Sequence, residues 1–243
     1  MLGNKCSVLS GSKNIKLVTY PFFYKMNCNF VYDLSKLLLR DIEAKKFPEI
    51  IKFAFWSRKS NLKSILKEYR KDHLRFGRGI CLHILPRNTS INFAYSFVFG
   101  LLSGNSNIIR IPNRDNLVKI IISKINILLK KKKFKDIKSS NAIILYDKNS
   151  GVTEDISLKS DIRLIWGSDQ TINEIKKIRT QPNCLDITFP DRFSLSVLNL
   201  EKINNTNLKN LIINFYNDAL FMDQNACSSP HLVLWYSKSG KKI

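Results

Sequence analysis

The stretch Gly79-Ile-Cys-Leu-His-Ile-Leu-Pro-Arg-Asn88 decides the fold, because a short apolar run ends there in a polar turn. A helical pattern follows over 91–103, then a second apolar run over 107–111 and a second helical pattern over 116–129. Apolar runs that alternate with helical periods predict strands joined by helices. This β-α-β-α order predicts a mostly parallel sheet that is covered on both faces.

The same alternation continues toward the carboxyl terminus. Further strands are predicted over 141–146, 161–166, 194–198 and 232–236, with helices over 170–179 and 208–222. We therefore expect an α/β fold with a Rossmann-type, mostly parallel sheet and helices on both faces. Ligands of such sheets bind beyond the carboxyl ends of the strands, so chemistry is expected in the loops that follow strands.

The residues before this stretch carry a different pattern. Residues 1–30 predict an irregular lead, and its aromatic cluster Tyr20-Pro-Phe-Phe-Tyr24 has no role that the sequence assigns. Apolar residues at helical spacing predict amphipathic helices over 31–43 and 48–68. A helical segment is therefore expected in front of the sheet.

Charge is the unusual feature of the composition. The 243 residues include 40 Lys and Arg against 19 Asp and Glu, which gives a net charge of +21. Such an excess attracts nucleic acid, anionic membranes and phosphorylated small molecules alike. The lysines are dispersed rather than arranged along one element, and Lys, Ile and Asn are abundant together, as an AT-rich coding sequence would leave them. We therefore expect no specific nucleic-acid partner.

The cysteines point away from disulfides and metal. They stand at positions 6, 28, 81, 184 and 227 without any CxxC pair, so neither a disulfide framework nor a metal site is predicted. The amino terminus lacks the apolar core of a signal peptide, and the longest largely apolar stretch, 93–102, is about half of what a membrane-spanning helix needs. A cytoplasmic location and no membrane span are the expectations.

Two loops that follow predicted strands could bind anions. Asn88 lies between a strand and a helix, where it could cap the helix or donate a hydrogen bond to an oxyanion. Gly167 permits close approach of a ligand to the backbone after the strand over 161–166, and Ser168 could cap the next helix. This turn could hold a pyrophosphate or be an ordinary capped helix, because it lacks a full dinucleotide-binding or Walker motif.

A third polar loop, Asp223-Gln-Asn-Ala-Cys-Ser-Ser-Pro-His231, holds one cysteine among small residues, and we group it with the two strand-exit loops. Cys227 could present its sulfur as a nucleophile, or be a small core residue as most cysteines are. His231 could act as its base, or simply begin the last strand, since no acidic partner is evident to orient it.

The loops and the segments between them resemble a known family. Pro86-Arg-Asn88, Asn92-Phe-Ala-Tyr-Ser and Phe99-Gly-Leu-Leu-Ser-Gly-Asn-Ser-Asn-Ile-Ile-Arg-Ile-Pro112 resemble the aldehyde dehydrogenase superfamily, and specifically its LuxC-type acyl-CoA reductases. Trp166-Gly-Ser168, Phe189-Pro-Asp-Arg-Phe-Ser194, Phe215-Tyr-Asn-Asp218 and the loop around Cys227 match the same family in the same order. The resemblance covers residue 79 to the end of the sequence.

The resemblance implies a reaction and a role for each site residue. The reaction would reduce an acyl-CoA, or an acyl-protein thioester, to a fatty aldehyde with NADPH, or alternatively with NADH. Cys227 would take up the acyl group as a thioester, and Asn88 would donate to the oxyanion. Gly167 and Ser168 would face the phosphates of the cofactor, and Arg110 would approach its adenosine ribose.

One departure from the wider superfamily is informative. Hydrolytic aldehyde dehydrogenases carry a Glu, followed by Leu-Gly-Gly, that activates water against the thioester, and the matching segment here begins at Phe189. A phenylalanine cannot act as this base, although the nearby Asp191 could, or could instead pair with Arg192. Without the base, the thioester would persist until it exchanges with a thiol or accepts hydride, as a reductase requires.

The resemblance also sets expectations for domains and partners. Residues 1–78 would be the amino-terminal helical segment of the cofactor domain, 79–200 the dinucleotide-binding domain, and 201–243 the beginning of a catalytic domain with the nucleophile loop. Family members are much longer, so a truncated catalytic domain is expected. Two hypotheses follow, an acyl-CoA reductase represented by its amino-terminal half, or an inactive remnant that retains dinucleotide or polyanion binding. The full-length form would be a homo-oligomer and could work with an acyl-activating synthetase.

Overall fold

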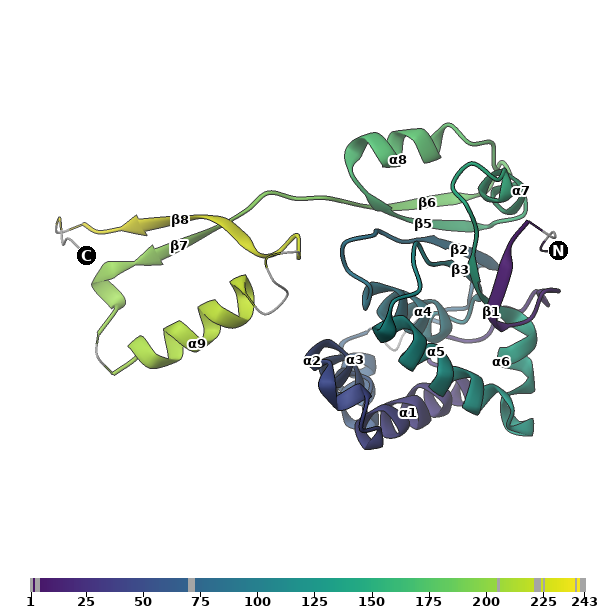
Figure 1. Cartoon of the computed structure of the whole chain (residues 1–243), viewed down its shortest axis with the longest axis horizontal. Coiled ribbons are helices and arrows are strands. Elements are labelled where there is room, and N and C mark those ends of the chain that lie inside the picture. Colours follow the sequence, from purple (N-terminus) through teal and green to yellow (C-terminus); the bar gives the residue numbers. More distant parts are fainter. Residues whose placement is uncertain are drawn as a thin grey trace. The chain divides into compact units, whose positions relative to one another are not determined.

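The chain forms two units, Met1–Phe189 and Pro190–Ile243 (Figure 1). The computed structural model describes residues 2, 5–69, 73–204, 206–220, 224, 226–238 and 240. Both units combine helices with strands, and the expected α/β class is confirmed. The domain limits predicted between residues 78 and 79 and between residues 200 and 201 separate functional parts of the chain, and they stay predictions.

A six-stranded sheet organises the first unit, with strand order β1-β4-β3-β2-β5-β6. Strand β2 is parallel to both β3 and β5, and β3 is parallel to β4, whereas β1 runs antiparallel to β4. The carboxyl ends of β2, β3, β4 and β5 therefore share one edge of the sheet. The strands are β1 (Ser7–Gly11), β2 (Ile80–Ile84), β3 (Ser106–Arg110), β4 (Asn141–Leu145), β5 (Ile162–Gly167) and β6 (Leu185–Pro190).

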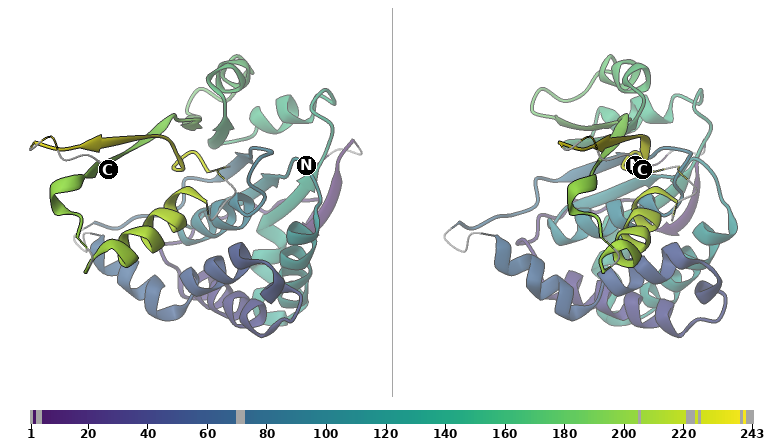
Figure 2. Two further views of the ribbon diagram at one scale, coloured as in Figure 1. Left: turned by 60° about the vertical axis from the view of Figure 1, so that its left-hand side comes forward. Right: turned by 90° about the vertical axis from the view of Figure 1, so that its left-hand side faces the viewer.

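Helices cover both faces of this sheet, as Figures 1 and 2 show. One face carries α7 (Val152–Ser157) and α8 (Asp169–Lys176), and the other carries α4 (Asn92–Leu102), α5 (Asn116–Leu129) and α6 (Lys135–Ser140). Helix α1 (Lys25–Arg40) packs against α4 and α5, and α2 (Pro48–Trp56) and α3 (Lys59–Glu68) pack against α1. Short 3₁₀ turns at Ala44–Lys46 and Lys132–Phe134 complete this layer.

The central strand β2 is buried along its whole length, as expected for a parallel strand between two helical layers. Ile80, Leu82 and Ile84 pack into the core under α7 and α8. Cys81 and His83 point to the opposite face, because successive side chains of a strand alternate. The apolar run from Ile80 to Ile84 therefore forms the centre of the sheet.

The structure corrects several predicted elements. Residues 7–11 form β1 rather than an irregular lead, since their backbone pairs with β4 from Ser7 opposite Leu145 onward. The helix predicted over 48–68 is two helices, because Arg58 adopts an extended conformation (ψ 151°) between them. Strand β6 and helices α6 and α7 were not predicted.

The second unit is a single β-α-β element. Strands β7 (Ser194–Asn199) and β8 (Pro230–Tyr236) are parallel, and they are joined through the 3₁₀ turn Leu200–Lys202 and helix α9 (Leu208–Ala219). The helix predicted over 208–222 is confirmed as far as residue 219, and its predicted residues 221 and 222 lie outside the described residues.

A buried histidine connects the strands that carry the candidate loops. His83 Nε2 lies 3.0 Å from Asn107 Oδ1 on β3, and its Nδ1 lies 2.7 Å from Ser96 Oγ on α4. An amide oxygen only accepts, so Nε2 carries the proton and Nδ1 accepts from the serine hydroxyl. Asn107 extends the network to β4 by donating to Asn141 Oδ1 at 2.7 Å. The ring is neutral in this arrangement.

We expect this histidine to weaken the fold as the solution becomes acidic. Burial lowers the pKa of His83 from 6.5 to about 4, against a smaller opposing effect of its hydrogen bond to Asn107. Below pH 6.5 the unfolded chain binds a proton that the folded chain does not, so the free energy of unfolding falls until about pH 4, by on the order of 3 kcal/mol in total. Urea unfolding between pH 7 and pH 4 measures this slope. The slope should be shallower in His83→Gln, and equal slopes would contradict the assignment.

Candidate active site

The loop after β2 is tied to the loop after β3. Ser90 donates a hydrogen bond from its hydroxyl to the carboxylate of Asp115. Asp115 also caps α5, because its Oδ1 accepts from the backbone N–H of Val118 at 2.9 Å. Asn88 lies exposed in the first of these loops. The structure thus places Asn88 at the carboxyl edge of the sheet, where the strand-exit rule predicts chemistry.

Arg110 ends β3 at the same edge. Its guanidinium lies over the ring of Tyr146, 5.6 Å from the ring centroid. Burial lowers the pKa of Arg110, with Arg87 acting in the same direction and Tyr146 opposing it. Its Nε is buried without a hydrogen-bond partner among the described residues. A buried donor without a partner is costly, so this N–H is available to an acceptor on a bound ligand.

Gly167 and Ser168 form the turn from β5 into α8. Gly167 has φ +156°, and a Cβ placed on it would lie 3.1 Å from Thr171 Cγ2, so the turn is shaped for glycine. Ser168 caps α8 by accepting a hydrogen bond from the backbone N–H of Thr171 at 3.3 Å. The N–H groups and positive end of α8 suit a phosphate at this turn, so the residues present fit the dinucleotide that the resemblance implies.

An aromatic pair next to this turn was missed by the sequence analysis. The rings of Trp166 on β5 and Phe189 on β6 stack with centroids 4.1 Å apart and planes 13° apart. The two residues are far apart in the sequence, and no local pattern connects them. Phe189, where the resemblance implies that the water-activating base is missing, thus packs against the residue before Gly167.

A buried arginine fixes α8 and β6 to β5. Arg163 donates from Nε and Nη2 to the two carboxylate oxygens of Asp186, at 2.7 and 2.6 Å. Its Nη1 lies 3.1 Å from the carbonyl oxygen of Ile175 and 3.3 Å from that of Ile178, at the end of α8. The sequence analysis did not single it out, although a lone arginine inside the apolar run of β5 is the signal that could have found it.

Cys227 is the exposed cysteine of the chain, and all five cysteines are described. Burial raises the pKa of the other four thiols, including that of Cys28 to about 11 and that of the fully enclosed Cys81 further still. A nucleophile must be accessible and ionised at a low enough pH, and these other thiols are not suited to that task. Exposure therefore separates Cys227 from the rest.

The position of the Cys227 loop corrects its grouping with the strand-exit loops. Ser194 Oγ donates to the backbone oxygen of Cys227 at 2.6 Å, and Ser194 pairs with Pro230 at the start of β8. The loop therefore lies at the amino ends of β7 and β8. His231 is the second residue of β8, which confirms that it lies at the start of the last strand. Its ring stacks on that of Phe193, with ring centroids 5.3 Å apart.

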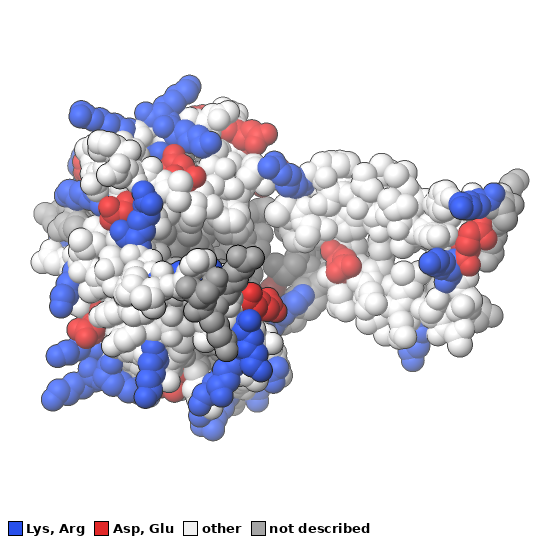
Figure 3. All heavy atoms as spheres, turned by 180° about the vertical axis from the view of Figure 1, so that it is seen from behind, with Lys and Arg blue, Asp and Glu red and all other residues white. Residues whose placement is uncertain are grey.

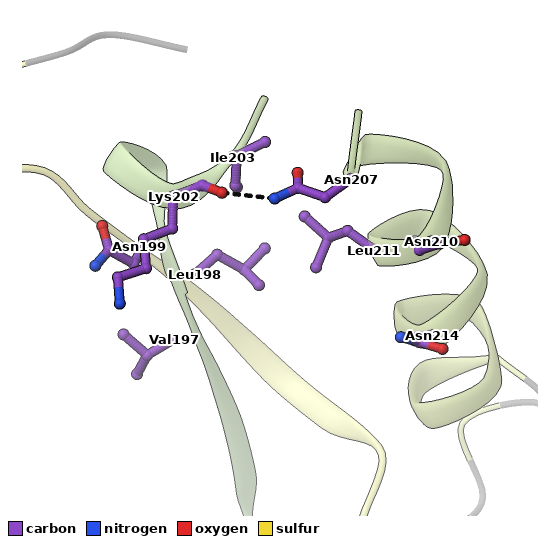
Figure 4. A pocket seen from close by; sticks show the side chains of 9 residues that line it. All are labelled: Val197, Leu198, Asn199, Lys202, Ile203, Asn207, Asn210, Leu211 and Asn214. Carbon is purple, nitrogen blue, oxygen red and sulfur yellow. Dashed lines mark hydrogen bonds between the residues drawn. The ribbon is translucent and has the colours of Figure 1, made fainter. Parts of the chain in front are cut away.

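The predicted site residues fall into two groups. Asn88, Arg110, Gly167 and Ser168 lie at one edge of the sheet in the first unit, and Cys227 lies in the second unit. The second unit also has a cavity of about 350 Å³ between the carboxyl end of β7 and α9, the opposite end of the strand from Cys227 (Figure 4). No predicted site residue lines it; its lining is Val197, Leu198, Asn199, Lys202, Ile203, Asn207, Asn210, Leu211 and Asn214.

A sequence model of the acyl-CoA reductase (LuxC) family matches residues 29–243, which is most of the chain. The chain belongs to this family. No curated protein matches the LuxC-family chain in sequence.

Solved structures show the fold of the LuxC-family chain. The aldehyde dehydrogenase KauB from Pseudomonas aeruginosa matches with a TM-score of 0.62 at 16% identity, over 86% of this chain and 46% of KauB. A lactaldehyde dehydrogenase matches with 0.61 at 13% identity, over 87% and 48%. An aldehyde dehydrogenase variant from Bacillus cereus matches with 0.59 at 11% identity, over 87% and 47%. The aldehyde dehydrogenase-like fold is thus confirmed, and the chain spans just under half the length of these structures.

The described part of the LuxC-family chain shows neither a membrane-spanning helix nor a metal cluster. Within it, no helix combines the length and the apolar character that crossing a bilayer requires. The same residues bring together no group of three or more His, Cys, Asp or Glu side chains that could hold a metal ion.

Proposed function

We propose that this chain is the cofactor-binding and nucleophile-bearing part of an acyl-CoA reductase, which forms a fatty aldehyde from a long-chain acyl thioester. The exposure of Cys227, in the loop where the family resemblance puts the nucleophile, is the observation that carries the proposal. The acyl group would come from CoA or from an acyl-protein. NADPH is the proposed cofactor, with NADH as the alternative.

In the proposed reaction Cys227 attacks first. Its thiolate sulfur bonds to the acyl carbonyl carbon, the bond from that carbon to the sulfur of CoA breaks, and CoA leaves as a thiolate. Asn88 donates a hydrogen bond to the carbonyl oxygen while negative charge builds on it. The product of this half-reaction is an acyl thioester on Cys227.

The cofactor would be held by residues of the first unit. Gly167 and Ser168, at the start of α8, would bind its phosphates, and the unpartnered Nε–H of Arg110 would bind its adenosine ribose or a 2′-phosphate. When bound, the nicotinamide supplies a hydride. With hydride on the acyl carbon, the bond to Cys227 breaks, Cys227 leaves as a thiolate and aldehyde is released. Phe189 provides no base to hydrolyse the thioester before then.

A second candidate function is dinucleotide binding without turnover, because the chain spans less than half of the solved relatives. Oxidation of NADPH in the presence of a long-chain acyl-CoA distinguishes the two. We expect no turnover by the purified 243-residue protein and turnover by a longer protein, if the DNA downstream encodes the rest of the catalytic domain. Aldehyde formed by the 243-residue protein would contradict the first expectation, and an inactive longer protein would contradict the reductase proposal.

The turn at Gly167 gives a test that needs no turnover. Gly167→Ala should weaken NADPH binding about tenfold or more, because the new Cβ meets Thr171 and the φ of +156° disfavours an L side chain. Calorimetric titration of the 243-residue protein with NADPH measures the Kd. Gly240→Ala is the matched control, since Gly240 also has a positive φ, +70°, but lies in the second unit. A Kd that Gly167→Ala leaves within twofold of the wild-type value would remove this turn from the site.

A further inference from the structure

The aromatic cluster near residue 20, which the proposed function leaves without a role, belongs to a surface of the first unit. Pro21 and Phe76 form an isolated antiparallel bridge, and the backbone N–H of Phe22 donates to Arg75 O at 2.9 Å. Phe22 also packs against Tyr69, with ring centroids 4.8 Å apart. Two segments of the chain thus build one surface. We call its residues the apolar patch: Tyr20, Phe22, Tyr24, Tyr69, Leu74 and Phe76.

The apolar patch lies at the edge of the sheet opposite the candidate cofactor site. Tyr20 accepts a backbone hydrogen bond from Gly77 N at 2.9 Å and donates one to Gly104 O at 2.8 Å. Gly77 precedes β2, and Gly104 precedes β3. The patch is therefore at the amino ends of these strands, whereas the candidate cofactor residues lie at the carboxyl ends of β3 and β5. A function of the patch does not depend on the proposed reaction.

Two side chains of the patch project into solvent. Leu74 is 93% exposed and Phe76 is 58% exposed, while Gly77 between Phe76 and the exposed Arg78 is buried. This alternation is that of an extended segment, with side chains on the same side about 7 Å apart. Two apolar side chains and then a cation therefore project in a row. Exposed apolar groups that lie together on one surface are typical of binding sites.

Three aromatic rings of the patch each have one face covered by a neighbouring side chain. Tyr20 and Tyr24 stack on each other at 4.7 Å with planes 2° apart. The guanidinium of Arg75 lies 5.6 Å from the centroid of Tyr69. A nucleic-acid base would need open ring faces on which to stack, and one face of each of these three tyrosine rings is covered. The most exposed side chains of the patch are those of Leu74 and Phe76, which have no hydrogen-bonding groups for a base or a phosphate, and this favours a lipid interface over RNA.

Cations border the apolar patch. Lys25 follows Tyr24 and is exposed, and Arg78 follows Phe76. Arg78 donates one hydrogen bond, from Nη2 to the carbonyl oxygen of Asn183 at 2.6 Å, out of the five N–H donors that a guanidinium carries. The net charge of the whole chain is +21, and Figure 3 shows Lys and Arg spread over the first unit with fewer acidic residues. The positive net charge would attract the protein to any anionic surface. The apolar patch would determine which side of the protein faces that surface.

We propose that the apolar patch docks the protein on the surface of an anionic lipid membrane. Leu74 and Phe76 enter the boundary between headgroups and acyl chains, and the tyrosines lie at headgroup level, where aromatic side chains are enriched. Lys25 and Arg78 lie near the lipid phosphates, where each cation adds to the attraction. The protein lies on the membrane and does not cross it.

Co-sedimentation with vesicles tests the proposal with the 243-residue protein. Vesicles of phosphatidylcholine with about one third phosphatidylglycerol should bind the wild type. The double variant Leu74→Ser, Phe76→Ser should bind them about tenfold or more weakly, because two apolar side chains no longer enter the lipid. Leu74→Ser alone should lose part of this affinity, and its side chain is too exposed to affect folding.

Leu158→Ser is the matched control, since Leu158 is 47% exposed at the end of α7, outside the patch. It should bind vesicles within twofold of the wild type. Equal binding by the wild type and the double variant would overturn the proposal, because net charge alone would then explain it. Absence of wild-type binding would overturn it too. So would a patch-dependent self-association seen by sedimentation velocity without vesicles, which would make the patch a protein interface.

Discussion

Replacing Cys227 with alanine is expected to reduce aldehyde formation at least about a thousandfold in a protein that carries the whole catalytic domain, because the proposed thioester forms on its sulfur. Cys227 is exposed in the polar loop before β8, while the other four thiols are partly or fully buried and have raised pKa values. The measurement is NADPH oxidation with a long-chain acyl-CoA, together with the aldehyde formed. Activity that persists in Cys227→Ala would refute the nucleophile.

The matched control for this substitution is Cys184→Ala. Cys184 is only half-buried, and its pKa is raised by that burial. The variant should keep aldehyde formation within about twofold, since small partly exposed side chains contribute little to stability. The 243-residue chain allows a second check, because limiting iodoacetamide should modify Cys227 first. Earlier modification of Cys28 or Cys81 would contradict the accessibility on which the proposal rests.

Local patterns predicted the elements that local physics determines. Helix α5 was predicted with its observed limits, because Asp115 caps it and apolar residues recur along one side. Strands β2 to β5 were found because buried parallel strands are continuous apolar runs. Strand β1 was missed because its residues are held by backbone pairing with β4, a partner more than 130 residues away that no local pattern reveals. Strand β6 alternates exposed and half-buried residues at the other edge of the sheet, which hid it among loops.

The positions of the candidate site residues were predicted to a similar degree, and their roles stay predictions. The strand-exit rule found Asn88, Gly167 and Ser168, because parallel strands bring their carboxyl ends to one edge. The Cys227 loop was found by its small residues and by the resemblance, and its position at the amino ends of β7 and β8 shows that the strand-exit rule did not apply to it. The Trp166–Phe189 stack and the Arg163–Asp186 pair join residues 23 positions apart, which only tertiary structure brings together.

The Arg163–Asp186 pair is expected to be the most sensitive polar contact in the first unit. Arg163 is 1% exposed, and it holds the Asp186 carboxylate with two donors. Removing one partner of a buried pair leaves an unpaired buried charge. Asp186→Leu should therefore lower the free energy of unfolding by about 3–5 kcal/mol. Arg163→Met should cost less than this, because Asp186 lies nearer the surface and can be solvated. Urea unfolding followed by circular dichroism measures both.

A surface pair in the same unit gives the contrast. Lys148 and Glu174 form an exposed ion pair at 3.2 Å, and Lys148→Met should change the free energy of unfolding by less than about 1 kcal/mol.

The double variant that combines Arg163→Met with Asp186→Leu tests whether the two residues act as a pair. It should recover part of the free energy of unfolding that Asp186→Leu loses, since no charge then remains unpaired. A double variant as unstable as the sum of the singles would show that the carbonyl oxygens of Ile175 and Ile178, rather than Asp186, depend on Arg163. In that case Arg163 would stabilise the end of α8 more than the edge strand β6, and NADPH affinity at the other end of α8 should fall in Arg163→Met but not in Asp186→Leu.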